Sequence, residues 1–212
     1  MTLKEYVEAM KEDQKEIYYA SGESIDKIRQ LPQLEKVLEK GYEVLCFTDS
    51  IDEFLTSVIL NYDNKPFKSI LKGDLDLESK EEKEELEKKS LDSKDLIEKL
   101  KEILKDKVSD VRLSSRLKTY PVCLVSDDNL SIDMEKVLRQ LNQENVKANK
   151  ILELNPEHEL FALLKSMYEK NEDLSEYAQL LYEQAALMAG LTIEDPAAYA
   201  LKITELMLKA KK

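Results

Sequence analysis

The C-terminal part of the chain contains two helical segments that each carry more apolar surface than one core can bury. Segment 174–188 has one stripe at three- and four-residue spacing, while Leu180 and Leu187 lie off it on a neighbouring face; the stripe is formed by Leu174, Tyr177, Leu181, Ala185 and Met188. Segment 197–208 has two stripes, formed by Ala197, Ala200, Leu201, Thr204 and Leu208 and by Tyr199, Ile203 and Leu206. A surface helix of a single domain needs one apolar stripe about 100° wide. The excess apolar surface predicts that these helices also pack against a partner, and an identical chain is the simplest candidate.

Two copies are therefore expected to pair through these helices as a four-helix bundle. The predicted dimer-interface residues are Leu174, Tyr177, Leu181, Met188, Tyr199, Leu201, Ile203 and Leu208. The alternative is that both stripes pack inside one large monomeric domain, because periodicity alone does not distinguish a core helix from an interface helix.

Composition limits the class of partner. The chain has 212 residues, enough for two domains, and its 42% hydrophobic and 36% charged residues with only four glycines favour a helix-rich globular protein. The net charge of −12 repels phosphate backbones and anionic lipid, which argues against nucleic acid or a membrane surface as the partner. No apolar run approaches the roughly 20 residues of a membrane span, and the first residues lack a signal peptide's apolar stretch. We expect a cytoplasmic protein.

Residues 1–77 alternate helical and extended patterns. Helical spacing at 3–10 precedes a β-rich run at 17–20, and a helix framed by Pro32 and Gly41 precedes an apolar strand at 42–47. A further amphipathic helix at 51–59 and an extended run at 67–71 follow. This order predicts a small three-layer αβα domain.

Residues 78–92 are almost entirely charged, which indicates a solvated helix or linker at a domain boundary. A second domain, 93–212, opens with an amphipathic helix and continues with β-rich runs at 108–113 and 122–125, which we expect to pair as a hairpin. A third strand is predicted at 151–154, and Asn155 with Pro156 is expected to start a helix. The predicted fold class is a helix-rich α+β fold: the αβα domain, then a mixed α/β domain with a three-stranded sheet and a C-terminal helical dimerisation hairpin.

A helix predicted at 130–141 carries one apolar face. This face consists of Leu130, Met134, Val137, Leu138 and Leu141, and Ser131 is a suitable N-cap. Ordinary core packing explains such a face. An exposed surface for apolar segments of unfolded proteins is the functional alternative, because flexible methionine adapts to varied shapes. Exposure of the face distinguishes the two interpretations.

No arrangement typical of catalysis or metal binding stands out. His158 is the only histidine and has no cysteine or carboxylate at metal-ligand spacing, so we expect it to have a structural role. Residues 73–76 lack the later glycines of phosphate-binding loops, and no nucleophile, base and orienting group form a triad. Cys46 and Cys123 lie in apolar runs and are expected to be reduced core residues. We predict no catalytic, cofactor or metal site.

Several stretches together resemble one family, the 90-kDa heat-shock chaperones, in particular its bacterial members. In order they are YVEAM at 6–10, IYYASGES at 17–24, GYEVLCF at 41–47, KGDLDL at 72–77, VRLSSRL at 111–117, PVCLVS at 121–126, ILELNPEH at 151–158 and EDP at 194–196. Each motif is weak alone, but their shared order covers nearly the whole chain and is specific.

The resemblance implies that residues 1–77 are the end of the family's middle domain and that 93–212 are its C-terminal dimerisation domain. It also implies that ATP and Mg are bound by another domain of a longer parent protein, so this fragment would hold no cofactor and would not be an ATPase. Client contacts in the family carry over to Leu130, Met134, Val137 and Leu138. The expected partners are a second copy of the chain and unfolded or partly folded client proteins.

Two other functions fit the same patterns. One is a small-molecule-binding α/β enzyme domain with a structural helical appendage, whose ligand would lie near residues 48–50, at the carboxyl ends of the strands. The other is a structural adaptor that dimerises without binding unfolded proteins.

Overall fold

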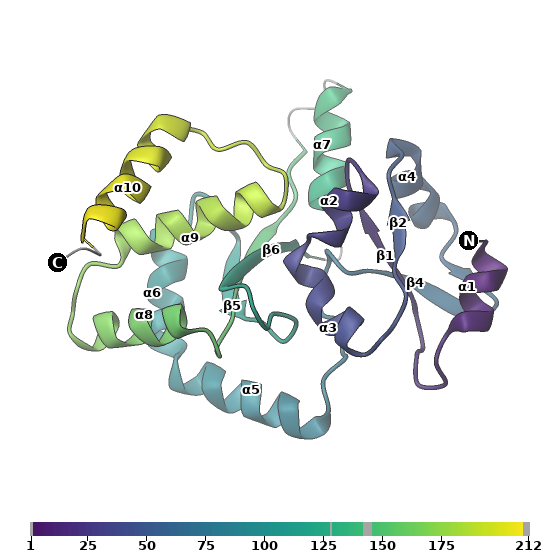
Figure 1. Ribbon diagram of the computed structural model, residues 1–212, viewed down its shortest axis with the longest axis horizontal. Helices are drawn as coiled ribbons and strands as arrows, with labels where there is room; N and C mark the ends of the chain where they lie inside the picture. The colour runs from purple at the N-terminus through teal and green to yellow at the C-terminus, as the bar shows by residue number, and fades with distance from the viewer. Residues whose placement is uncertain (1, 128, 142–145, 210–212) are drawn as a thin grey trace.

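The computed structural model describes residues 2–127, 129–141 and 146–209. It contains two β-sheets, each covered by helices, and the two sheets lie side by side along the long axis of the molecule (Figure 1). The prediction of a helix-rich α+β fold is confirmed. We call residues 2–77, which hold the four-stranded sheet, the first unit, and residues 93–209, which hold the three-stranded sheet, the second unit.

The first unit is built around strand β1, which is buried along its whole length. Its elements are α1 (Leu3–Ala9), β1 (Ile17–Ser21), α2 (Ile25–Arg29), the 3-10 helix η1 (Pro32–Leu34), α3 (Glu35–Glu39), β2 (Leu45–Phe47), α4 (Ser50–Val58), β3 (Asn61–Tyr62) and β4 (Lys65–Ser69). The strand order is β2-β1-β4-β3, with β1 parallel to both β2 and β4. Apolar side chains from β1, α2, η1 and α3 form its core.

Tyr6 connects the first helix to this sheet. Its side chain is 1% exposed, and its hydroxyl donates to the carbonyl oxygen of Glu43 at 2.6 Å. The Tyr6 hydroxyl oxygen in turn accepts hydrogen bonds from Gln14 Nε2 at 3.0 Å and from the Tyr18 amide at 3.1 Å. Burial raises the pKa of the Tyr6 hydroxyl, which therefore stays protonated and able to donate.

The second unit follows helix α5 (Lys80–Asp92), which the charged run forms. Its elements are α6 (Lys94–Ile103), β5 (Asp110–Leu113), β6 (Val122–Ser126), α7 (Ile132–Gln140), β7 (Lys150–Leu154), α8 (Glu159–Glu169), α9 (Ser175–Met188) and α10 (Pro196–Lys209). Helices α6, α8 and α9 pack with the sheet around one core. None of the described side chains of α5 is buried, as expected for a solvated helix.

The predicted hairpin between the first two strands of this unit is wrong. Strand β7 lies in the centre, parallel to β5 and antiparallel to β6, so Leu152 pairs with both Val111 and Leu124. In β7, Leu152 and Leu154 are 1% and 2% exposed. Strand β6 is buried along its whole length and β7 only over its last three residues, so burial alone does not set the strand order, and no pattern local to residues 108–125 reveals that third strand.

Helix α8 also begins later than predicted. The N-cap is His158, whose Nδ1 accepts a hydrogen bond from the Leu160 amide at 3.1 Å. Asn155 instead donates from Nδ2 to the carbonyl oxygens of Lys118 and Tyr120, at 2.9 and 3.0 Å. A polar side chain followed by proline looked like a cap, but here it holds the loop between β5 and β6.

Candidate dimer and client interfaces

The predicted interface residues of α9 lie mostly inside their own chain. Leu174 and Leu181 are each 3% exposed and belong to the core of the second unit. Tyr177 and Met188 are partly buried and pack against the same core. The monomer core therefore covers the first apolar stripe of the terminal hairpin, and the surface open to a partner is narrower than the predicted set.

Helix α10 has the opposite environment. None of its described side chains is buried, and Leu201, Met207 and Leu208 are 60%, 67% and 64% exposed. Tyr199 and Ile203 are half-buried.

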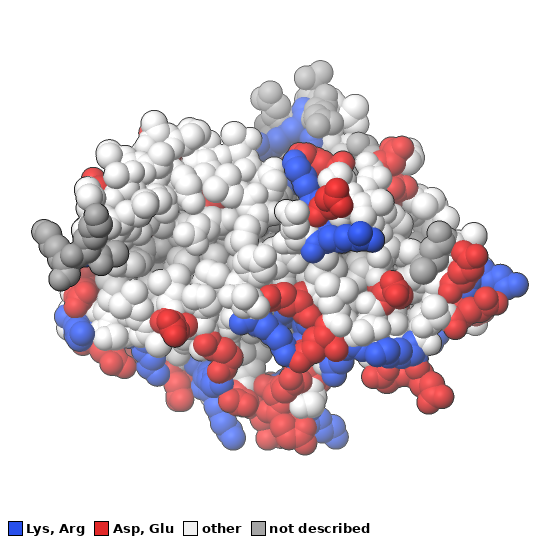
Figure 2. All heavy atoms as spheres, viewed as in Figure 1, with Lys and Arg blue, Asp and Glu red and all other residues white. Residues whose placement is uncertain are grey.

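The contacts of α10 with α9 include polar ones at two levels of the hairpin. Lys202 Nζ donates to Gln179 Oε1 at 3.0 Å, and Lys209 Nζ donates to Glu176 Oε2 at 3.3 Å. Figure 2 shows the face over α9 and α10 as largely uncharged, whereas charge gathers along the lower edge of the same view. The apolar side chains of α10 are thus left facing away from the core of their own chain.

The four predicted client residues lie on or beside α7 and are neither core nor freely exposed. Leu130 packs against the second-unit core, whereas Met134, Val137 and Leu138 are half-buried. Leu141, at the end of the helix, is 60% exposed.

Two polar contacts fix α7 in place. Ser131 is the N-cap as predicted, and its Oγ accepts from the Met134 amide at 2.8 Å. Glu135 Oε2 accepts from the Ala148 amide at 2.8 Å and from Lys150 Nζ at 2.6 Å, which connects α7 to β7. Burial acts to raise the pKa of the Glu135 carboxyl, but these hydrogen bonds and charges outweigh it and lower that pKa.

Sequence reasoning missed a second apolar helix face. Helix α4 was predicted only as an amphipathic helix of the αβα domain, with no role for its apolar face, yet Ile51, Leu55 and Val58 are 64%, 45% and 79% exposed. The helix contacts α7 across the two units. Only the exposure of these side chains shows that the apolar face of α4 is open to a partner, because the same apolar spacing occurs in core helices. The two helices form what we call the α4–α7 surface: Ile51, Phe54, Leu55, Val58, Met134, Val137 and Leu138.

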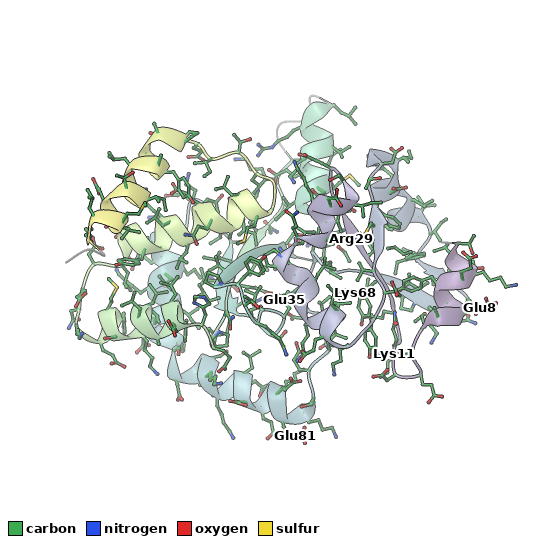
Figure 3. The ribbon with its side chains drawn as sticks, in the orientation of Figure 1. Glu8, Lys11, Arg29, Glu35, Lys68 and Glu81 are labelled. Atoms are coloured by element: carbon green, nitrogen blue, oxygen red, sulfur yellow. The ribbon has the colours of Figure 1, made fainter. Side chains whose placement is uncertain are left out.

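Hydrogen bonds across the seam join the two units. Gln33 Nε2 donates to the Leu124 carbonyl oxygen at 2.6 Å, and the Glu35 carboxylate, labelled in Figure 3, accepts from the backbone amides of Lys118 and Thr119. The segment after β4 also runs along the edge of β6. There the Ser126 amide donates to the Leu71 carbonyl oxygen at 3.0 Å, and the Gly73 amide donates to that of Ser126 at 2.9 Å.

A buried charge cluster lies beside that segment. Arg116 and Glu153 are 1% and 2% exposed, and Arg116 Nε lies 2.9 Å from Glu153 Oε2. Arg112 Nη2 lies 2.7 Å from the other carboxylate oxygen, and Ser114 Oγ donates to Glu153 Oε2 at 2.8 Å. Burial acts to raise the pKa of the Glu153 carboxyl, but the two guanidinium groups hold it below its ordinary value. Glu153 is therefore ionised at neutral pH.

A cleft of about 490 Å³ also opens at the seam, between the end of β1, α2, α7 and the end of α9. Its lining includes Ser21 and Gln33, whose Oγ and Oε1 atoms have no hydrogen-bond partner among the described residues. Residues 48–50, where the enzyme alternative expected a ligand, do not line this cleft. The ligand of the enzyme alternative stays a prediction.

The two cysteines differ in burial. Both cysteines are free thiols, and burial raises the pKa of the Cys123 thiol, which keeps it protonated. Cys46 is only half-buried, in contrast to the core position predicted for it. Across the described ranges, no three His, Cys, Asp or Glu side chains are arranged to hold a metal ion. No helix in the described part of the chain has the length and apolarity needed to cross a membrane.

Comparison with known proteins gives a consistent family. The family model described as "Hsp90 protein" matches residues 1–212. The chain is 51% identical over 209 residues to "Chaperone protein HtpG" of Clostridium botulinum (strain Loch Maree / Type A3), and 47% identical over 210 residues to the protein of that name from Bacillus subtilis (strain 168). These matches cover 98% of this chain but 33% and 34% of the relatives, so the chain spans about a third of their length. A family model that matches from end to end, on a fold with the expected helix-rich α+β architecture, shows that this chain belongs to the Hsp90 family.

Proposed function

We propose that this chain is the dimerising, client-binding part of an Hsp90-family chaperone. Residues 1–77 would be the end of the middle domain and residues 93–212 the C-terminal dimerisation domain, with α5 between them. The observation that carries the proposal is α10, an apolar helix of which no described side chain is buried. Most apolar surface of that extent on a soluble protein is covered by a partner.

An identical chain is the partner that best fits α10. Its outward leucines and the exposed Leu187 at the end of α9 supply the apolar positions of a two-fold four-helix bundle. The α9 stripe packs inside each monomer, so we assign the interface to Tyr199, Leu201, Ile203 and Leu208, supported by the neighbouring Met207. Charged residues of α10 pair with α9, which leaves the centre of the bundle apolar.

Light scattering tests the dimer. We expect a dimer mass at micromolar concentration and a monomer mass for Leu201→Glu and for Leu208→Glu, because a buried unpaired carboxylate costs several kcal/mol, on the order of 3 or more. Leu91→Glu is the matched control: Leu91 is 74% exposed on α5, far along the chain from the hairpin. A monomer mass for the unaltered chain would contradict the proposal.

The α4–α7 surface is the proposed client site. It places exposed aliphatic side chains of α4 next to Met134, Val137 and Leu138 of α7, and methionine lets such a surface adapt to varied sequences. Its extent across two helices suits extended segments of unfolded protein. A purely structural adaptor would not need it.

Binding of reduced, carboxymethylated α-lactalbumin, a permanently unfolded probe, tests this site. We expect the Met134→Ser/Leu138→Ser double variant to bind the probe about thirtyfold more weakly, because each truncation removes roughly 1 kcal/mol of apolar burial. The dimer mass should be unchanged. Leu91→Ser is the control, and equal affinity of all three proteins would support the adaptor interpretation instead.

Nucleotide hydrolysis is proposed to belong to parts of the longer relatives with which this chain does not align. The chain alone should release no phosphate from ATP and magnesium above the rate without protein. Saturable hydrolysis by the purified chain would overturn this assignment.

A further inference from the structure

Among the described residues, Arg116 is one of the largest side chains with less than 2% exposure. It belongs to the second unit, and its guanidinium donates hydrogen bonds to the first unit. Besides Glu153, its guanidinium donates to the carbonyl oxygens of Ile70, at 2.8 Å, and of Gly73. Arg112 Nη2 also donates to the Gly73 carbonyl oxygen, at 3.2 Å, and lies 2.8 Å from Asp74 Oδ1. Two guanidinium groups of the second unit thus hold the last segment of the first unit.

A buried ion pair adds little stability compared with well-packed apolar residues, because desolvation offsets the attraction of the charges. Its geometry is nevertheless demanding, since each donor must keep its acceptor or leave a buried charge unpaired. A planar guanidinium that bonds two carbonyl oxygens and one carboxylate at once fixes the position of residues 70–73 in several directions. The cluster is therefore better suited to fixing an orientation than to stabilising a core.

The orientation in question is that of α4 relative to α7. Helix α4 belongs to the first unit and α7 to the second; the two helices contact each other, and α7 is also attached to its own sheet through Glu135 and β7. Residues 70–73 follow β4 directly and join the first sheet to the edge of β6. A change of angle at this segment moves the two halves of the α4–α7 surface apart.

We propose that Arg116 is a positioning residue of the client surface: held by Glu153, its guanidinium fixes the carbonyl groups of Ile70 and Gly73 and so keeps α4 beside α7. Arg116 does not touch the client itself. The inference rests on the proposed client function, but the orientation it concerns can be measured without a client.

The first measurement is the distance between the units. Spin labels on a non-natural amino acid at the exposed Glu8 and Glu169 leave both cysteines unchanged, and dilution with unlabelled chain removes signals between copies. We expect a single narrow distance distribution for the unaltered chain and for Arg29→Met, an exposed arginine on α2 (Figure 3). Arg116→Met should broaden the distance distribution at least twofold, because the hydrogen bonds to the carbonyl oxygens are lost. Arg116→Lys should give a width between those of the unaltered chain and Arg116→Met.

The second measurement is the coupling between α4 and α7 in binding the unfolded probe. With Arg116 in place, we compare the affinity loss of the double variant Val58→Ser/Leu138→Ser with the product of the losses of the two single variants. The two values should differ by about fivefold, because the two positions are coupled. In the Arg116→Met background, Val58→Ser and Leu138→Ser should each still weaken probe binding. The affinity loss of the double variant should then equal the product of the two single losses, a coupling factor of about 1. This pattern distinguishes a positioning role of Arg116 from a loss of folding. An unfolded chain would lose both single affinity effects as well as their coupling.

The outcomes are distinct. A narrow, unchanged distance distribution in folded Arg116→Met overturns the inference. If Arg116→Met does not fold, the decision passes to Arg116→Met/Glu153→Leu, which leaves neither buried charge unpaired and still lacks the carbonyl contacts. If Val58→Ser and Leu138→Ser leave probe binding unchanged in the unaltered chain, the client proposal fails and the distance measurement alone decides whether Arg116 fixes the orientation.

Discussion

The carboxylate of Glu153 lies between two guanidinium groups and almost out of contact with water. Because its pKa is lowered in the folded chain, the unfolded chain binds this proton more readily. The stabilisation it gives is present above the ordinary glutamate pKa and is lost as the pH falls through the lower, folded value. Acid should therefore loosen the seam between the two units.

Glu153→Gln tests this at the residue scale. We expect a loss of about 3 to 5 kcal/mol of unfolding free energy at pH 7, because Arg116 is left without its counter-charge. We also expect a shallower fall in stability as the pH drops below the ordinary glutamate pKa, since one titrating group is gone. Urea unfolding at each pH measures both. The control Glu157→Gln removes an exposed ion pair with Lys89 and should cost less than about 1 kcal/mol; a similar cost for both variants would contradict this account of Glu153.

At the scale of elements, α7 is a short helix held at its first turn and near its middle. Its first turn depends on the Ser131 cap, and its middle is attached to β7 by Glu135. Only part of its apolar face is buried, so these polar contacts have a larger share in fixing it than they would in a core helix.

Ser131→Ala should therefore act locally. Loss of the acceptor for the Met134 amide is expected to cost about 1 kcal/mol and to speed hydrogen exchange of the first-turn amides of α7 about fivefold. Exchange in α9 should be unchanged. Ser166→Ala, in the middle of α8, is the comparison, and equal effects on α7 from both substitutions would contradict the cap assignment.

At the scale of the whole molecule, the proposed dimer links stability to concentration. A folded dimer that unfolds to two chains gains stability by mass action, so Tm should rise by about 2 °C for each tenfold increase in protein concentration. Scanning calorimetry over a hundredfold range measures it. Leu201→Glu should remove the dependence while leaving a cooperative transition, because the second-unit core does not include α10. A concentration-independent Tm in the unaltered chain would count against the dimer.

The sequence by itself determined the elements whose signals are local. Apolar spacing, the Pro32 and Gly41 boundaries and the Ser131 cap located helices and strands, because these signals act within a few residues. The excess apolar surface of the terminal hairpin was also readable from spacing, although which helix carries it was not.

Only the tertiary structure decided which surfaces are covered. Spacing is the same for a stripe that packs inward, as Leu174 and Leu181 do, and for one that faces outward, as on α4 and α10. The central place of β7 and the burial of Arg116 depend on partners tens of residues away along the chain. Burial and pairing are properties of long-range contacts, and a local pattern specifies what a segment can bury but not which neighbour will cover it.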